Sequence, residues 1–304
     1  MDYSNFLKTI TERIRERVSD EYTVETHAMR KNNGVMLDSL MIRRPDDMVC
    51  PNIYLNDIYR WYLDGASMDQ LTDRILDTYH NAAAAMQIRA EELITPEIIR
   101  RQVVRRLINY EKNRDLLANV PHRRFLDLAL IYYVMVHNDR MGEGAIMVRN
   151  DFLDLYSMDA SEIEEEACQN TRSLLPADFL RISDLLREFG EKCGAHSYSD
   201  ITLEEESVES PLYVLTNRSR QFGACYMADT EVLSGIAGRL ESDVYILPSS
   251  VHECMIVPAE QWEDTSALSE MVREINRTQV SEEEYLSNTI YRFRRETQKV
   301  ETAV

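Results

Sequence analysis

The feature that most constrains the fold is a pair of short apolar runs, residues 244–247 and 254–257, on either side of the polar segment 248–253. Both runs are rich in β-branched residues, and two such runs joined by a short polar link are typical of a buried antiparallel hairpin. The link reads Pro-Ser-Ser-Val-His-Glu, so it carries two hydroxyls, an imidazole and a carboxylate. The sequence therefore predicts a hairpin whose link holds the densest set of reactive groups in the chain.

The same hairpin pattern recurs elsewhere, between residues 22–30 and 35–42 and between 125–136 and 144–148. Helical periodicity occupies much of the remaining chain, in mixed order with the strands, which favours an α+β fold of antiparallel sheets with helices packed on them. The expected helices are 4–18 (with Ser4 as N-cap), 54–63, 67–90, 95–108, 150–190, 230–240 and 266–277, and further strands are expected at 212–215, 224–227 and 289–294.

Two regions are expected along the chain. Residues 1–94 form a hairpin-plus-helices region, and residues 95–304 form a larger α+β region. The polar, acidic segment 195–210 marks a further expected boundary inside the larger region.

The charge balance narrows the choice of partners and compartment. The net charge is −19, which repels nucleic acids and anionic membranes at long range. No apolar run is long enough to cross a bilayer, and the N-terminus lacks the pattern of a signal peptide. The five cysteines are scattered without a CxxC pair, which is typical of a reducing compartment. We therefore expect a cytoplasmic protein without a membrane partner, and the net charge disfavours a nucleic-acid partner unless a local basic patch overrides it.

Several motifs resemble a bacterial domain of unknown function, found mainly in Gram-positive gut anaerobes. They are Tyr245-Ile-Leu-Pro-Ser-Ser-Val-His-Glu253, Leu268-x-x-Met-Val-x-x-x-Asn276, Leu286-Ser-Asn-x-x-Tyr291, Asn52-Ile-Tyr-Leu-Asn-x-x-Tyr59 and Leu107-Ile-Asn-Tyr-Glu-Lys-Asn113. The resemblance extends from about Asn32 to the C-terminus. It implies a bacterial, cytoplasmic protein and carries no activity with it.

The link offers one candidate catalytic site. Ser250 could attack a substrate with His252 as its base and Glu253 assisting, as in a hydrolase. The alternative is structural: the serine hydroxyls, including that of Ser249, would bond the local backbone, and the link would present a binding surface. The nucleophile-elbow motif GxSxG is absent from this segment.

A basic stretch, residues 100–124, opposes the acidic character of the rest of the chain. Arg100, Arg101, Arg105 and Arg106 could together bind a phosphate group or an RNA end. Alternatively, these arginines form the solvated face of a helix and pair with the acidic helices of the same chain.

Neither a metal nor a cofactor is predicted, because the six histidines are dispersed and the HExxH, DxDxDG and glycine-rich phosphate-loop motifs are absent. The favoured interpretation is a non-enzymatic binding or interaction module that contacts an unknown protein or small molecule through the link. The hydrolase and the phosphate- or RNA-binding module are the two alternatives, and whether the chain is an enzyme stays open.

Overall fold

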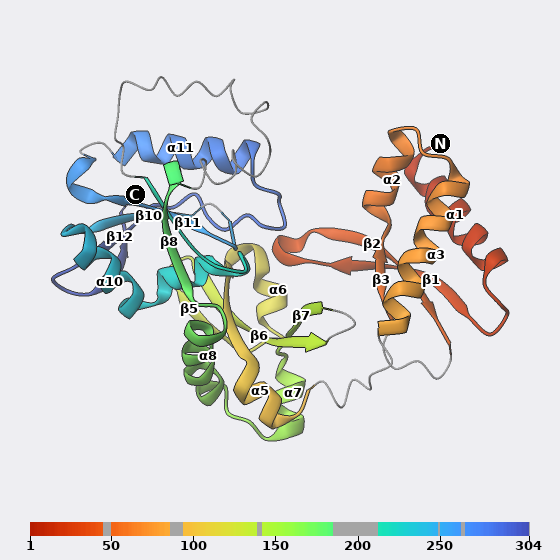
Figure 1. Ribbon diagram of the computed structural model, residues 1–304, viewed down its shortest axis with the longest axis horizontal. Coiled ribbons are helices and arrows are strands. Elements are labelled where there is room, and N and C mark those ends of the chain that lie inside the picture. Colours follow the sequence, from red (N-terminus) through yellow and green to blue (C-terminus); the bar gives the residue numbers. More distant parts are fainter. Residues whose placement is uncertain are drawn as a thin grey trace. The chain divides into compact units, whose positions relative to one another are not determined.

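The computed structural model describes residues 1–44, 50–85, 94–138, 142–184, 212–248, 250–262 and 265–303. The chain forms two compact units (Figure 1): Met1–Ile99 with Val134–Ile146, and Arg100–Tyr133 with Met147–Val304. The elements α5 (Pro96–Gln102), β6 (Leu128–Asn138) and β7 (Gly142–Met147) each span a boundary between these units. The boundary expected at 195–210 lies outside the described residues.

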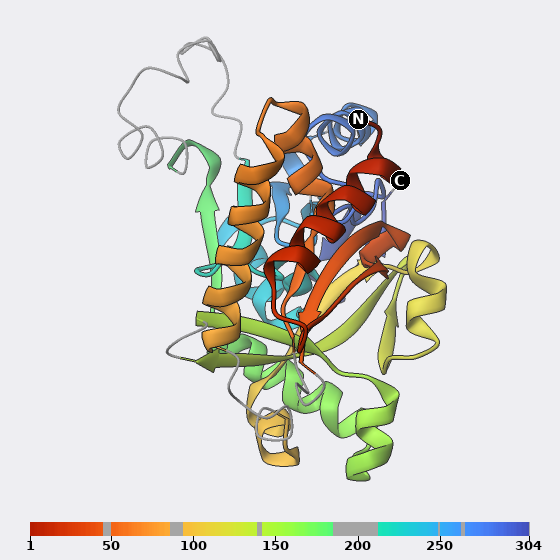
Figure 2. The same ribbon diagram turned by 90° about the vertical axis from the view of Figure 1, so that its right-hand side faces the viewer.

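The first unit combines a three-stranded antiparallel sheet, in the order β1-β2-β3, with helices packed on it. Figure 2 shows α1 and α3 next to each other, and Arg13 of α1 pairs there with Asp69 of α3 at 2.5 Å. The elements are α1 (Tyr3–Arg17), β1 (Thr23–Arg30), the 3-10 helix η1 (Asn32–Gly34), β2 (Met36–Arg43), β3 (Asn52–Tyr54), α2 (Leu55–Leu63) and α3 (Met68–Ala85).

Alternation and helical spacing explain the core of this unit. Phe6, Ile10 and Ile14 recur on one side of α1 and are fully buried against Leu40 and Ile42 of β2. The cap of α1 is Asp2, whose carboxylate accepts the backbone N–H of Asn5, so the prediction of Ser4 as N-cap is wrong.

The second unit contains a six-stranded sheet in the order β13-β12-β10-β11-β9-β8, and every strand pair with a described register is antiparallel. The predicted hairpin is confirmed as β10 paired with β11, with Val244 opposite Pro258 and Pro248 opposite Cys254. The strands are β8 (Ala177–Arg181), β9 (Tyr213–Asn217), β10 (Val244–Pro248), β11 (Cys254–Pro258), β12 (Tyr291–Arg294) and β13 (Lys299–Thr302).

A smaller sheet joins β4 (Val103–Asn109), β6 and β5 (His122–Phe125), and β7 pairs with β6 as predicted. The other elements of this part of the chain are η2 (Glu111–Asn113), α6 (Arg114–Leu117), α7 (Asn150–Tyr156), α8 (Ala160–Leu174), η3 (Gly223–Ala228), α10 (Thr230–Leu240), η4 (Ala259–Gln261) and α11 (Thr265–Thr278).

Both faces of the six-stranded sheet are buried. Alternate residues such as Tyr245 and Leu247 pack against Leu268 and Val272 of α11, which covers one face in Figure 1. Their neighbours Val244 and Ile246 belong to a larger core on the other face, where the sheet meets the following buried side chains of β4, β6, η3 and α10: Leu107, Leu128, Leu130, Ala224, Cys225, Tyr226, Met227, Leu233, Ile236 and Ala237. The predicted α+β class is confirmed.

Three local predictions are wrong. The helix expected over 95–108 ends at Gln102 and continues as β4, which is buried on both faces. Buried strands are recognised by a continuous apolar run, and Arg105 and Arg106 interrupt that run here. Residues 224–227 form the fully buried 3-10 helix η3 rather than a strand, because a short apolar run does not reveal its own period. The helical stretch expected at 150–190 is interrupted by β8 at the edge of the sheet.

In the part of the chain that the structure describes, no helix combines the length and the apolar character needed to cross a lipid bilayer.

Candidate functional site

The link between β10 and β11 closes as a hydrogen-bonded bend. The backbone N–H of Ser250 donates to the carbonyl of Glu253 at 3.2 Å. The hydroxyl oxygen of Ser250 accepts the backbone N–H of His252 at 3.1 Å. A serine side chain that bonds the backbone two residues later stabilises a turn, which is the structural role weighed for this residue. Ser249 lies outside the described residues.

Two other segments fix the link in place. The hydroxyl of Thr216, in β9, donates to the carbonyl of His252 at 2.9 Å. The backbone N–H of Val251 donates to the carbonyl of Glu284 at 2.9 Å, and the Val251 side chain is fully buried in the core. The link is therefore a rigid part of the second unit, held by β9 and by the segment that follows α11.

The imidazole of His252 has both ring nitrogens directed at groups other than Ser250. Its Nδ1 accepts the backbone N–H of Phe222 at 3.3 Å, and its Nε2 lies 3.6 Å from a carboxylate oxygen of Glu284. With Nδ1 as the acceptor, the proton of the neutral ring is on Nε2, so neither nitrogen offers a lone pair to a hydroxyl. Among the described contacts, Ser250 and the ring of His252 do not form a nucleophile–base pair.

Burial lowers the pKa of His252, and the positive charge of Arg106 lowers it further. The Glu284 carboxylate and the Arg220 backbone carbonyl act in the opposite direction and do not outweigh them. The ring is consequently neutral at neutral pH, while 30% of the side chain stays exposed to solvent.

The loop that presents Phe222 to this imidazole has an unusual backbone. Arg220 and Phe222 both adopt left-handed conformations, with φ of 54° and 60°, which non-glycine residues rarely occupy. A Cβ on Gly223 would lie 2.5 Å from the carbonyl oxygen of His252, so only glycine fits there. Such strained positions gather at binding and catalytic sites, where the surrounding structure enforces them.

Arg106 completes the site from the neighbouring strand β4. Its guanidinium carbon lies 5.0 Å from the ring centre of Phe222 and 5.5 Å from that of Tyr133, and one Nη donates to the Tyr133 hydroxyl at 3.3 Å. The Phe222 ring in turn stacks on His252 with 6.2 Å between the ring centres. Arg106 forms no ion pair with any carboxylate of the described residues, and among these residues its buried Nε, like that of Arg105, has no hydrogen-bond partner.

Glu253 is half-buried beside His252. Burial raises the pKa of Glu253, the charge of Arg220 lowers it, and the charge of Glu284 raises it. The net result is a pKa above that of an ordinary glutamate. The site thus brings together Arg106, Tyr133, Phe222, His252, Glu253 and Glu284, with Arg220 at its edge; this set is called the His252 site below.

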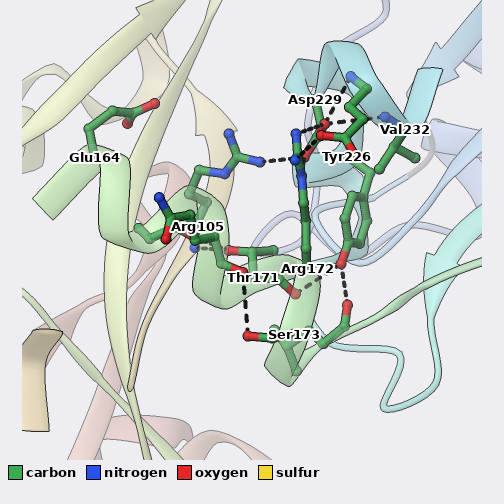
Figure 3. Close-up of polar contacts among 12 residues, drawn as sticks. Arg105, Glu164, Thr171, Arg172, Ser173, Tyr226, Asp229 and Val232 are labelled. Carbon is green, nitrogen blue, oxygen red and sulfur yellow. Dashed lines mark hydrogen bonds and ion pairs between the residues drawn. The ribbon is translucent and has the colours of Figure 1, made fainter. Parts of the chain in front are cut away.

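Arg105 does not belong to a surface patch. Its side chain is 2% exposed and donates to Asp229 at 3.0 Å, as Figure 3 shows. Arg172 of α8 donates twice to the same carboxylate, at 2.7 and 2.8 Å, and Asp229 also caps α10 by accepting the N–H groups of Glu231 and Val232. Burial raises the pKa of Asp229, but these hydrogen bonds and the two arginines outweigh it and hold the pKa below its ordinary value.

The other basic residues do not form one exposed surface either. Arg100 pairs with Glu162 and Glu166 of α8, which is the intramolecular pairing expected in the second interpretation of this stretch. Arg123 pairs with Glu164. Arg101 is exposed and forms no ion pair within the described residues. Arg100, Arg101, Arg105 and Arg106 therefore do not face solvent together, as the phosphate- or RNA-binding alternative required: Arg105 is interior, Arg100 is paired and Arg106 lies against aromatic rings.

No three histidine, cysteine, aspartate or glutamate side chains of the described residues come close enough together to hold a metal ion.

Three members of the His252 site escaped the sequence analysis: Tyr133, Phe222 and Glu284. They come from β6, from the loop before η3 and from the segment after α11, so no local motif joins them. The one usable signal is Gly223, because a glycine next to a buried aromatic residue can mark a close approach between two backbones.

Membership of a known family follows from comparison with other proteins. The chain belongs to the family described as "Family of unknown function (DUF5688)", whose model matches residues 3–295. Neither the curated proteins nor the solved structures contain a match to this chain. The resemblance to a domain of unknown function is thus confirmed, and it begins nearer the N-terminus than Asn32.

Proposed function

We propose that this chain is a non-enzymatic binding module whose His252 site receives an anionic group of a partner through Arg106. The observation that carries the proposal is the state of that guanidinium. It is half-buried, it is flanked by two aromatic rings, and no carboxylate of the described residues neutralises it.

The neighbouring Arg100 and Arg105 support the proposal, because they are paired with carboxylates and Arg106 is not. Arg106 is half-buried, and it differs from Arg100 and Arg105 on the same stretch, because it has no carboxylate partner among the described residues. Arg105 and Arg172 share Asp229, and Arg100 bonds two glutamates. The Nε of Arg106 is a buried donor without a partner among the described residues, as is that of Arg105, but only Arg105 has a carboxylate as its counterion. A charged group that lacks a counterion favours a partner that supplies one. Guanidinium groups bind carboxylates and phosphates well, since their planar donors match such oxygens.

The surroundings of Arg106 suit binding better than catalysis. The hydroxyl of Ser250 is engaged by the backbone of the link, and the imidazole of His252 faces Phe222 and Glu284. The hydrolase alternative stays a prediction with a simple test. If Ser250 were a nucleophile, Ser250→Ala would abolish any ester or amide hydrolysis that the protein shows; a structural serine predicts no such loss.

A surface for RNA or phosphate spread over residues 100–124 receives no support from the arrangement of these side chains, because Arg105 is interior and Arg100 is paired. Within the part of the chain that the structure describes, the large exposed apolar side chains lie in separate segments and do not indicate an apolar docking face; they are Met1, Met36, Leu63, Leu155 and Leu174. Charge recognition at Arg106 is therefore the better-founded mode of binding.

We infer a reducing bacterial cytoplasm as the compartment. Cys225 and Cys254 are fully buried free thiols, and Cys168 is also free, as expected of a protein that does not depend on disulfides.

Calorimetric titration tests the proposal. Propionate and inorganic phosphate serve as probes for the wild type, for Arg106→Gln and for Arg101→Gln, a control that removes the same charge from an exposed arginine. A charge-assisted hydrogen bond contributes about 1.5–3 kcal/mol, so Arg106→Gln should weaken binding of at least one probe about tenfold or more. Equal affinities for the two variants, or no binding by the wild type, would contradict the proposal.

A further inference from the structure

The His252 site contains a carboxylate that is positioned as firmly as its arginine. Glu284 follows α11 in a turn where its backbone N–H donates to the hydroxyl of Ser281 at 3.2 Å, and that hydroxyl donates to the Glu284 carboxylate at 3.1 Å. The backbone carbonyl of Glu284 holds Val251 of the link at the same time. The carboxylate is thereby fixed beside Nε2 of His252, with 46% of the side chain exposed.

The imidazole does not neutralise this carboxylate. The distance of 3.6 Å between Nε2 and the Glu284 oxygen is longer than a normal hydrogen bond, and the ring is uncharged at neutral pH. Glu253 adds a second carboxyl group nearby, since the charge of Glu284 acts on it. Around the imidazole of His252 the site therefore presents an arginine and an acidic group that still accepts hydrogen bonds, and both charges act on His252.

We infer that the ligand is a small zwitterion: an anionic group bonds Arg106, and an ammonium group of the same molecule bonds Glu284. This rests on the proposed function and narrows its ligand class. A simple anion that approaches Arg106 is repelled by Glu284, whereas a molecule with both charges satisfies the two residues together. Glu284 is then the residue that selects between these two classes of ligand.

Matched pairs of probes separate the two classes. Glycine, β-alanine and 4-aminobutyrate are titrated against acetate, propionate and butyrate, which lack only the ammonium group; the three lengths sample different separations of charge. Binding is followed through the imidazole resonances of His252. An exposed ion pair corresponds to about a two- to fivefold gain in affinity. At least one amino acid should therefore bind more tightly than its matched acid by that factor.

The variant Glu284→Gln should erase this preference and tighten binding of the simple acids. Glu282→Gln, which neutralises an exposed carboxylate in the same turn, should keep the preference. The inference is overturned if the simple acids bind as tightly as the amino acids in the wild type, or if the preference survives Glu284→Gln.

These results are distinct from a failure of the proposed function. Binding of acids that depends on Arg106 but shows no gain from the ammonium group would contradict only the zwitterion. Binding that ignores Arg106, or the absence of binding by any probe, would contradict the proposed function itself.

Discussion

Two adjacent arginines in β4 show how the position of a residue decides its role. Successive side chains of a strand point to opposite faces, so Arg105 and Arg106 meet different environments. Arg105 reaches the buried carboxylate of Asp229, and Arg106 lies against the rings of Tyr133 and Phe222. The first is held by an ion pair, and the second keeps its charge available beside His252.

The charge of Arg106 should be measurable at His252. Because a nearby positive charge disfavours the imidazolium, Arg106→Gln should raise the pKa of His252, and Glu284→Gln should lower it. The measurement is a pH titration of the imidazole resonances of His252, with Arg101→Gln as the control that leaves the pKa unchanged. A pKa that does not respond to Arg106→Gln would show that the two residues are not electrostatically coupled.

At the scale of elements, one carboxylate fastens three of them together. Asp229 caps α10, accepts from Arg105 of β4 and accepts twice from Arg172 of α8 (Figure 3). Thr171 strengthens the joint between α8 and β4, since its hydroxyl accepts the backbone N–H of Arg105 at 2.9 Å. This buried network fixes the position of β4, the strand that carries Arg106.

Removing the carboxylate of Asp229 should strongly lower the stability of the fold. Asp229→Ala leaves Arg105 charged and without its partner in the interior, which costs about 3–5 kcal/mol of unfolding free energy. Glu231→Ala is the matched control: Glu231 also pairs with Arg172 but is 76% exposed, so its loss costs about 0–1 kcal/mol. Denaturant unfolding of both variants measures the difference, and similar values for the two would contradict this role of Asp229.

The same network predicts a pH dependence. The pKa of Asp229 is lower in the folded chain than its ordinary value, so its stabilising contribution is present at neutral pH and is lost as the pH falls into the acid range. Stability should therefore fall less steeply on acidification in Asp229→Ala than in the wild type. If the unfolding free energy of the wild type and of Asp229→Ala fell equally steeply from neutral to acid pH, this role of Asp229 would be contradicted.

The loop before η3 offers a second test at this scale. Gly223→Ala places a Cβ 2.5 Å from the His252 carbonyl and 2.7 Å from the Cα of Thr216. We expect a loss of about 1–3 kcal/mol and a shift of the His252 resonances, because the backbone must move. Gly235→Ala in α10 meets nothing within 4 Å and should instead add about 0.5–1 kcal/mol. A Gly223→Ala variant as stable as the wild type would mean that the loop adapts freely.

For the whole molecule, the sequence was sufficient wherever a pattern is local. The hairpin of β10 and β11, the pair β1 and β2, and helices such as α10 follow from runs and spacings within a few residues. The partner of Arg105 lies 124 positions away in the sequence, and Arg106, Phe222 and His252 come from three separate segments. The site is formed by contacts between residues that are distant in the sequence. The sequence analysis therefore singled out His252 and Arg106 separately, but it could not predict that they lie in the same site.

Each unit has its own apolar core, and each contains one of the two tryptophans. Trp61 packs in the first unit, and Trp262 packs beside α11 in the second. We expect each unit to report its own unfolding transition. Fluorescence of Trp262→Phe then follows the first unit and fluorescence of Trp61→Phe the second, and Asp229→Ala should shift only the second. Equal shifts of both signals would show that the chain unfolds as one cooperative unit.

The most direct test of the central claim is the Nε–H resonance of Arg106 in a nitrogen-resolved spectrum, recorded while propionate is added. That buried donor has no partner within the described residues, so a bound anion should change its resonance more than that of any other arginine. We expect a saturable shift that follows the affinity from calorimetry and disappears in Arg106→Gln. A resonance that stays fixed while propionate binds would place the anion elsewhere and contradict the account.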